Sequence, residues 1–228
     1  MNQVKQGYEE LAGHWLYEGL TNTEIVELFD KSTLVEYRKR ETVVKRGEFA
    51  THMVLLLEGF VKLEIQEGKR DFIIDIESGA NFIGLPIMLS VEKHLFSIVT
   101  LTDAKVVFVP VESLKQMLKA NPKFAQAIVD HGNNAFVIPL LDKLRSASQN
   151  NIRGRLAKQL IHLSTHVHRS ASFNLLVSRL EMAHMIGFSR ENVIRVLAEF
   201  NSENIIAING KTIEILNLNR LEELAKYS

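Results

Sequence analysis

Arg190, Glu191 and Arg195, near the C-terminus, have the residue types and spacing that can read DNA bases. Arginine can donate two parallel hydrogen bonds to O6 and N7 of guanine, and glutamate can accept one from N4 of cytosine. Ile194 lies between them and offers an apolar surface to a thymine methyl group. On a helix over residues 190–200 these side chains share the outward face. A solvated surface helix can carry the same charges, so the flanking sequence is needed to distinguish a DNA-reading helix from an ordinary surface helix.

The residues before this helix predict a second helix and a tight turn. Ser178-Arg179-Leu180-Glu181 is a capping box, in which the serine hydroxyl and the glutamate carboxylate each accept from a backbone amide at the helix start. Gly187 interrupts the helical pattern, and Ser189 provides a second N-cap. Two helices joined by a glycine-bearing turn form a helix-turn-helix, which presents its second helix to the DNA major groove.

The residues after the reading helix predict a β-hairpin. Residues 205–208 and 211–216 are rich in β-branched side chains, and Asn209-Gly210 between them is the strongest short hairpin signal. A hairpin directly after a recognition helix is a wing, and Lys211 at its tip could contact a phosphate. The three features in this order are much more specific for DNA binding than any one of them.

Other candidate chemistry in the chain is weaker. We find no nucleotide-binding loop, no nucleophile elbow and no paired acids in a recognisable setting, so the sequence predicts no enzyme. The absence of cysteine excludes disulfides, thiolate zinc sites and cysteine-ligated iron–sulfur clusters. His162 and His166 are spaced to share a helical face, with His168 close behind, and could hold a divalent metal. With no carboxylate beside them, we interpret them as a solvated polar face and predict no metal site.

The elements that must position these residues change character along the chain. A helix is predicted over residues 23–31, followed by short β-rich runs punctuated by glycine over 34–110. From residue 112 the pattern is helical, with a long stretch over 122–147 that Pro139 should kink or interrupt. A further helix is predicted over 152–167. Val137, Leu140 and Leu144 on the long stretch have coiled-coil spacing, which favours a dimer interface over packing onto the chain's own barrel.

Composition and charge allow a nucleic-acid partner. The chain has 228 residues, 46% of them hydrophobic, enough for two domains, and its formal net charge is zero. The charge is uneven, because residues 149–228 hold ten Lys and Arg against seven Asp and Glu, which leaves 17 against 20 upstream. Such a basic region suits a polyanion or a solvated surface about equally. A polar N-terminus and short apolar runs predict a soluble protein with no membrane partner.

Residues 176–216 resemble the DNA-binding domain of the Crp-Fnr family of bacterial regulators. Residues 187–195, GFSRENVIR, follow the family signature Gly-x-Ser-Arg-Glu-x-Val-x-Arg. Upstream, residues 44–48 (VKRGE) and 57–62 (LEGFVK) resemble the family's β-roll effector domain. The resemblance therefore covers nearly the whole chain and is strongest in its last third.

The resemblance implies a cytoplasmic bacterial transcription regulator that binds double-stranded DNA as a homodimer and contacts RNA polymerase. It implies base reading by Arg190, Glu191 and Arg195, to which we add Ile194. It also implies that Arg179 and Ser189 help hold phosphates, and we expect Lys211 to do the same. The long helix through Leu144 would form the dimer interface.

The sequence departs from the family in the effector domain. Cyclic-nucleotide-binding members hold the ribose with a glutamate after Phe-x-Gly and the phosphate with an Arg-Ser pair. Here the first segment is FIGLP over residues 82–86, and Leu95-Phe96 replace the Arg-Ser pair. A phosphate buried there would lack a charged partner, so cyclic AMP is not the expected effector. The degenerate pocket consists of Gly84, Leu85, Leu95 and Phe96, and its effector is an unknown small molecule.

Haem is an alternative cofactor, because some relatives bind it through histidine. His52 and His94 lie in or near the predicted roll, but each is more often an ordinary surface or hydrogen-bonded residue. No cofactor is therefore predicted, and haem is left open.

The predicted fold class is α+β, with an N-terminal cyclic-nucleotide-binding-like β-roll over residues 1–110, a connecting dimerisation helix over 111–149 and a winged helix-turn-helix over 150–228. The predicted function is a Crp-Fnr-type regulator that binds an inverted-repeat operator. The alternative is a ligand- or haem-sensing module whose DNA binding is weak or vestigial. An intact outward face on the helix over 190–200 favours the regulator.

Overall fold

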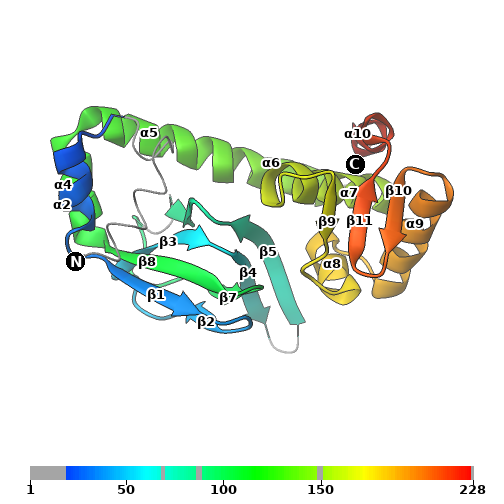
Figure 1. Cartoon of the computed structure of the whole chain (residues 1–228), viewed down its shortest axis with the longest axis horizontal. Helices are drawn as coiled ribbons and strands as arrows, with labels where there is room; N and C mark the ends of the chain where they lie inside the picture. Colours follow the sequence, from blue (N-terminus) through cyan, green and yellow to red (C-terminus); the bar gives the residue numbers. More distant parts are fainter. Residues whose placement is uncertain (1–18, 68–69, 86–88, 148–150, 227–228) are drawn as a thin grey trace. The chain divides into compact units, whose positions relative to one another are not determined.

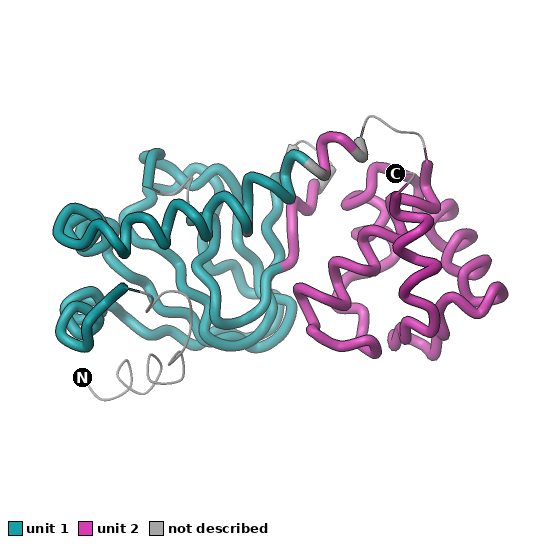
Figure 2. Tube along the Cα trace, turned by 90° about the horizontal axis from the view of Figure 1, so that it is seen from above, with its two compact units in different colours: residues 1–65, 77–141 teal, residues 66–76, 142–228 magenta. Residues whose placement is uncertain are grey.

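The computed structural model describes residues 19–67, 70–85, 89–147 and 151–226. It divides into two compact units, one of residues 1–65 and 77–141 and the other of residues 66–76 and 142–228 (Figure 2). No helix within the described ranges is long and apolar enough to span a membrane. The architecture is α+β, as predicted from the sequence.

In the described part of the chain before residue 111, eight strands form two four-stranded sheets (Figure 1). The first sheet has the order β1 (Thr33–Tyr37), β8 (Ala104–Pro110), β3 (His52–Glu58) and β6 (Asn81–Ile83). The second has the order β2 (Thr42–Val44), β7 (Ser97–Thr100), β4 (Phe60–Glu67) and β5 (Arg70–Ser78). The glycine-punctuated β-rich runs of the sequence thus become the strands of these two sheets.

A hydrophobic core joins the first sheet to three helices of the same unit. Met53, Leu55 and Val107 on β3 and β8 are buried in one cluster with Leu114 and Phe124. The helices are α2 (Asn22–Phe29), α4 (Val111–Ala120) and α5 (Pro122–Gly132). The nearly continuous apolar run of β3 follows from this position, since both faces of the strand are buried.

Pro139 is preceded by a local change of helix type. The π-helical turn η2 (Asn133–Val137) follows α5, and α6 (Ile138–Ala147) follows η2. The amide of Ile138 donates to the carbonyl of Asn133, five residues back, as in a π-helix. A π-turn shifts the backbone hydrogen bonds, so the proline, which cannot donate one, is accommodated without ending the helix. The predicted disturbance at Pro139 therefore takes the form of a π-turn.

The C-terminal unit is a small helical domain with a three-stranded sheet. Its helices are α7 (Ile152–His162), continued by the π-turn η3 (Leu163–Val167), then α8 (Arg179–Ile186), α9 (Arg190–Ser202) and α10 (Leu218–Lys226). The sheet has the order β10 (Ile206–Asn209), β11 (Thr212–Ile215) and β9 (Ser172–Asn174). Helix α7 is central, because α8, α9 and α10 all pack against it.

Candidate nucleic-acid interface

The helix-turn-helix begins with the predicted capping box at α8. The Ser178 hydroxyl accepts from the Glu181 amide at 3.1 Å, and the Glu181 carboxylate accepts from the Ser178 amide at 2.8 Å. Both bonds satisfy amides that have no partner within the helix. They fix the residue at which α8 starts, and with it the position of Arg179.

A left-handed glycine makes the turn between α8 and α9. Gly187 has a φ of 72°, a conformation that L side chains adopt only at a cost. The guanidinium of Arg155 on α7 holds this turn from the side, since its Nη1 donates to the Ile186 carbonyl at 2.9 Å and the group lies 5.0 Å above the centre of the Phe188 ring. Nothing in the local sequence pattern pointed to Arg155.

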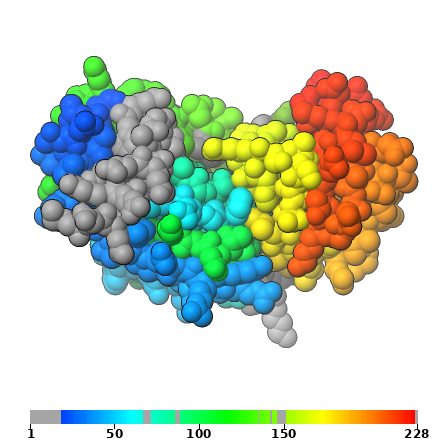
Figure 3. Space-filling view, in the orientation of Figure 1, coloured from blue at the N-terminus to red at the C-terminus, as the bar shows by residue number. Residues whose placement is uncertain are grey.

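Helix α9 has one buried and one exposed face. The Ser189 hydroxyl caps it by accepting from the Asn192 amide at 3.3 Å. Arg190, Glu191 and Arg195 are exposed, and 44% of Ile194 is accessible to solvent. In the space-filling view the α9 and hairpin segments, orange to red, reach the molecular surface (Figure 3). The buried face packs into the domain and consists of Val193, Val196, Leu197 and Phe200.

The wing is a two-residue hairpin that lies one residue later than the sequence suggested. Asn209 pairs with Thr212, so Gly210 and Lys211 form the turn, instead of Asn209 and Gly210. Gly210 has a φ of 59°, which the first central residue of both favoured hairpin turns requires. Lys211 is exposed at the tip. The hairpin is extended by β9, a third strand that pairs with β11 and that the sequence did not predict.

The three predicted phosphate-contacting residues differ in the exposure and the existing hydrogen bonds of their polar groups. Lys211 has an exposed side chain. The Ser189 hydroxyl already accepts a capping bond, but its proton can still be donated to a phosphate oxygen. Arg179 is half-buried, and its Nη1 is buried without a hydrogen-bond partner among the described residues. Burial lowers the pKa of Arg179 below the usual arginine value, although an arginine stays protonated.

An ion-pair network behind α9 was not predicted from the sequence. Arg195 pairs with Glu199, one helical turn further on, and Glu199 also accepts from Arg153 of α7 at 2.8 Å. Arg153 makes two further bonds to the carboxylate of Glu203, at 2.9 and 2.7 Å. The only sequence signal was the four-residue spacing of Arg195 and Glu199. One of the candidate base-reading residues is therefore already held by a neighbour.

In the predicted degenerate effector pocket, the Phe96 side chain packs against Gly84. Phe96 is only 2% exposed, and a Cβ built on Gly84 would lie 2.5 Å from the tip of the Phe96 ring. Leu85 is also buried, whereas Leu95 is 46% exposed. The ring thus lies against Gly84, and the sequence has no arginine between residues 84 and 109. Gly84, Leu85 and Phe96 are therefore buried, whereas Leu95 is exposed to solvent.

The histidines have different environments. His52 is exposed, and its Nδ1 lies 2.9 Å from the Thr51 hydroxyl. His94 is 5% exposed, and its Nδ1 is buried without a hydrogen-bond partner among the described residues. Burial lowers the pKa of His94, and the nearby charge of Glu48 partly opposes this.

The sequence-based view that no carboxylate lies beside the later histidines is wrong. Asp75 of β5 lies 3.0 Å from His162 Nε2, and the His162 and His166 rings stack with their centres 5.3 Å apart. Burial alone would raise the pKa of Asp75, but hydrogen bonds and charge from His162 and Lys143 outweigh it and hold that pKa well below the usual value. The carboxylate belongs to Asp75, which lies 87 residues before His162 in the sequence. Within the described ranges no group of three or more acidic or histidine side chains is arranged to hold a metal ion.

A helix-turn-helix followed by a hairpin on a small sheet is a winged-helix DNA-binding domain, here preceded by a β-roll. Residues 34–121 match the model of the cyclic nucleotide-binding domain, and residues 154–224 match the Crp-like helix-turn-helix domain. The chain belongs to the Crp-Fnr family of transcription regulators, which are not enzymes.

A curated relative is similar to the chain over most of its length, and solved structures share its fold. The chain is 23% identical to the CRP-like cAMP-activated global transcriptional regulator of Mycobacterium tuberculosis, over 96% of this chain and 99% of the relative. FixK2 from Bradyrhizobium japonicum superposes with a TM-score of 0.76 at 21% identity, over 85% of this chain and 96% of that one. The c-di-GMP responsive global regulator CLP of Xanthomonas campestris gives 0.69 at 21% identity, over 86% and 99%. Two of these regulators have a nucleotide in their names, cAMP in the first and c-di-GMP in the third.

Proposed function

We propose that the chain is a sequence-specific DNA-binding regulator in which α9 of each protomer of a homodimer enters the major groove of an inverted-repeat operator. The observation that carries this proposal is the exposed face formed by Arg190, Glu191, Ile194 and Arg195 on a helix whose opposite face is buried. Arg190 and Glu191 would read a G·C pair and Ile194 a nearby thymine. Arg179, Ser189 and Lys211 would contact phosphates, which fixes the register of the helix.

Exposed apolar side chains on the long helical stretch support the homodimer. Leu144 is 60% exposed, and Val137 and Leu140 are each 38% exposed. Ile138 and Leu141 are also exposed, so the apolar surface is wider than the predicted stripe. Leaving several large apolar side chains in water is unfavourable, and a second copy of the same helix would cover them. Contact with RNA polymerase and a cytoplasmic location rest on family membership alone.

The effector is proposed to be a small molecule other than cyclic AMP, because Phe96 fills the space beside Gly84 and no arginine lies between residues 84 and 109. The proposed domains are the β-roll over 1–110, the connecting helix over 111–149 and the winged helix over 150–228.

The alternative of a haem- or ligand-sensing module with vestigial DNA binding is disfavoured by the intact α9 face. His52 is exposed beside the Thr51 hydroxyl, and His94 is buried, so the two rings have different environments in this domain.

Selection of binding sites from random duplex DNA tests the proposal. The wild type should enrich an inverted repeat. Arg190→Ala should lose preference at one base pair in each half-site, at a cost of about 1–3 kcal/mol. Recovery of no preferred sequence by the wild type would reject sequence-specific binding, and an unchanged preference in Arg190→Ala would reject α9 as the reading helix.

A further inference from the structure

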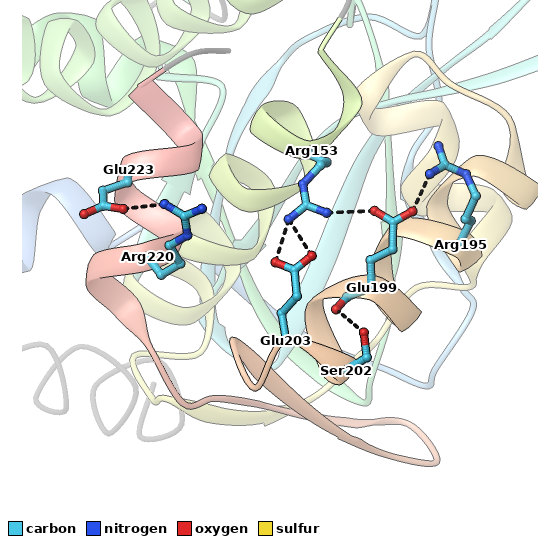
Figure 4. Close-up of polar contacts among 7 residues, drawn as sticks. All are labelled: Arg153, Arg195, Glu199, Ser202, Glu203, Arg220 and Glu223. Carbon is cyan, nitrogen blue, oxygen red and sulfur yellow. Dashed lines mark hydrogen bonds and ion pairs between the residues drawn. The ribbon is translucent and has the colours of Figure 1, made fainter.

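Two arginines from different helices share the carboxylate of Glu199 (Figure 4). Glu199 Oε1 accepts from Nη1 of Arg195, and Glu199 Oε2 accepts from Nη1 of Arg153 at 2.8 Å. Arg195 and Glu199 lie on successive turns of α9, whereas Arg153 lies in the first turn of α7. The carboxylate thus connects the base-reading helix to the helix on which it packs.

Arg153 is itself held in place on two sides. Its Nη2 bonds both oxygens of Glu203, at 2.9 and 2.7 Å, and its guanidinium lies 5.1 Å from the centre of the buried Phe200 ring. The hydrogen bond to Glu203, with that to Glu199, raises the pKa of Arg153. A planar guanidinium with several partners has little freedom to rotate. Arg153 therefore presents a fixed donor to Glu199.

The geometry at Arg195 leaves its reading edge available. Glu199 bonds Nη1, and the neighbouring Nε and Nη2 groups form a second edge with two parallel donors. That edge can address O6 and N7 of guanine. The side chain of Arg195 is 57% exposed, so without Glu199 it would sample many rotamers in water. A contact that removes these rotamers before DNA binds lowers the entropy cost of reading the base.

We propose that Glu199 is a positioning residue that orients Arg195 for base reading, and that Arg153 positions Glu199. The inference rests on the proposed function, since it concerns how one base pair of the operator is discriminated. Glu199 and Arg153 need not touch the DNA to act in this way. They determine specificity through Arg195.

The variants Glu199→Gln and Arg153→Gln each remove one charged link of the network and keep a side chain of similar length. Glu223→Gln is a matched control for Glu199→Gln, because it removes the same charge from an exposed ion pair with an arginine, Arg220 on α10, at 2.7 Å. Arg195→Ala defines the base pair concerned, as the position at which this variant loses preference in site selection.

Fluorescence anisotropy then gives the affinity of each variant for the selected operator and for the same DNA with that base pair replaced. The ratio of the two affinities measures discrimination and does not depend on the fraction of protein that is folded. Arg195→Ala should lower the ratio on the order of tenfold, and Glu199→Gln and Arg153→Gln about threefold each. The Glu223→Gln control should keep the wild-type ratio. In an Arg195→Ala background, Glu199→Gln should lower it no further.

The outcomes separate this inference from the proposed function. A wild type that does not discriminate between the two DNAs would contradict the proposed function itself. If the wild type and Arg195→Ala behave as expected but Glu199→Gln and Arg153→Gln keep the wild-type ratio, the positioning role is wrong. It is also wrong if Glu199→Gln binds both DNAs more tightly with an unchanged ratio, because the carboxylate would then only compete with DNA for Arg195.

Discussion

Lys211 is a residue whose charge should contribute affinity without contributing specificity. It lies at the tip of the hairpin turn with an exposed side chain, and a flexible ammonium group there can bind a phosphate as a point charge. Lys211→Ala should weaken binding to all sequences alike and lower the slope of log affinity against log salt by about one unit per subunit. Lys226→Ala, which removes the same charge from the end of α10, is the control and should leave the slope unchanged. A changed base preference in Lys211→Ala would contradict a phosphate contact.

His94 should make the stability of the effector domain depend on pH. Its pKa in the folded state lies below the ordinary value of 6.5 because burial disfavours the charged ring. Below that value the unfolded chain takes up a proton more readily than the folded chain, so folding becomes less favourable as the pH falls. Urea unfolding at pH 7.5 and pH 5.5 should therefore show a smaller loss of stability in His94→Gln than in the wild type.

His52→Gln serves as the comparison for this experiment, because His52 is exposed on the same unit. It should lose as much stability as the wild type between the two pH values. If His94→Gln loses the same amount too, protonation of His94 is not what destabilises the folded chain in acid.

At the scale of elements, the turn between α8 and α9 depends on one backbone conformation. Gly187→Ala would force an L side chain into the left-handed region at a φ of 72° and should destabilise the winged-helix domain by on the order of 1–2 kcal/mol. Gly187→Asn should cost less, since asparagine tolerates that region better than alanine. Thermal unfolding measures both. Equal stability of wild type and Gly187→Ala would show that this turn relaxes without cost.

Elements with a strong local signal could be predicted from the sequence. The capping box at Ser178, the glycine at Gly187 and the Asn-Gly pair gave the helix-turn-helix and its wing, because each signal is set by residues within a few positions. Strand β9 and helix α10 were missed. β9 has only three residues and exists because it pairs with β11, nearly forty residues later.

The polar contacts between elements could not be predicted for the same reason. Arg153 and Glu199 are 46 residues apart, and Asp75 and His162 are 87 apart. No periodicity links such pairs, and only the packing of α7 against α9, or the placement of β5, brings them together. The one-residue shift of the hairpin turn depends on the register of β10 with β11, which is fixed by the burial of Ile213 and Ile206.

For the whole molecule, the effector domain should not respond to cyclic AMP. The space beside Gly84 is occupied by the Phe96 ring, and a phosphate there would lose its hydration without gaining a cationic partner. Isothermal titration calorimetry with cyclic AMP and with cyclic GMP should show no binding at micromolar concentrations. Micromolar affinity, with competition between the two nucleotides, would contradict this account of the pocket.

The central claim is that two copies of α9 read one operator as a pair, and its most direct test is the spacing of the half-sites. A dimer presents its reading helices about one helical turn apart, roughly 34 Å. Inserting about five base pairs, roughly half a turn, between the half-sites places them on opposite faces of the DNA while every base contact stays available. The wild type should bind the selected inverted repeat at least about tenfold more tightly than the DNA with the insertion. Equal affinity for the two DNAs would contradict reading by a dimer through α9.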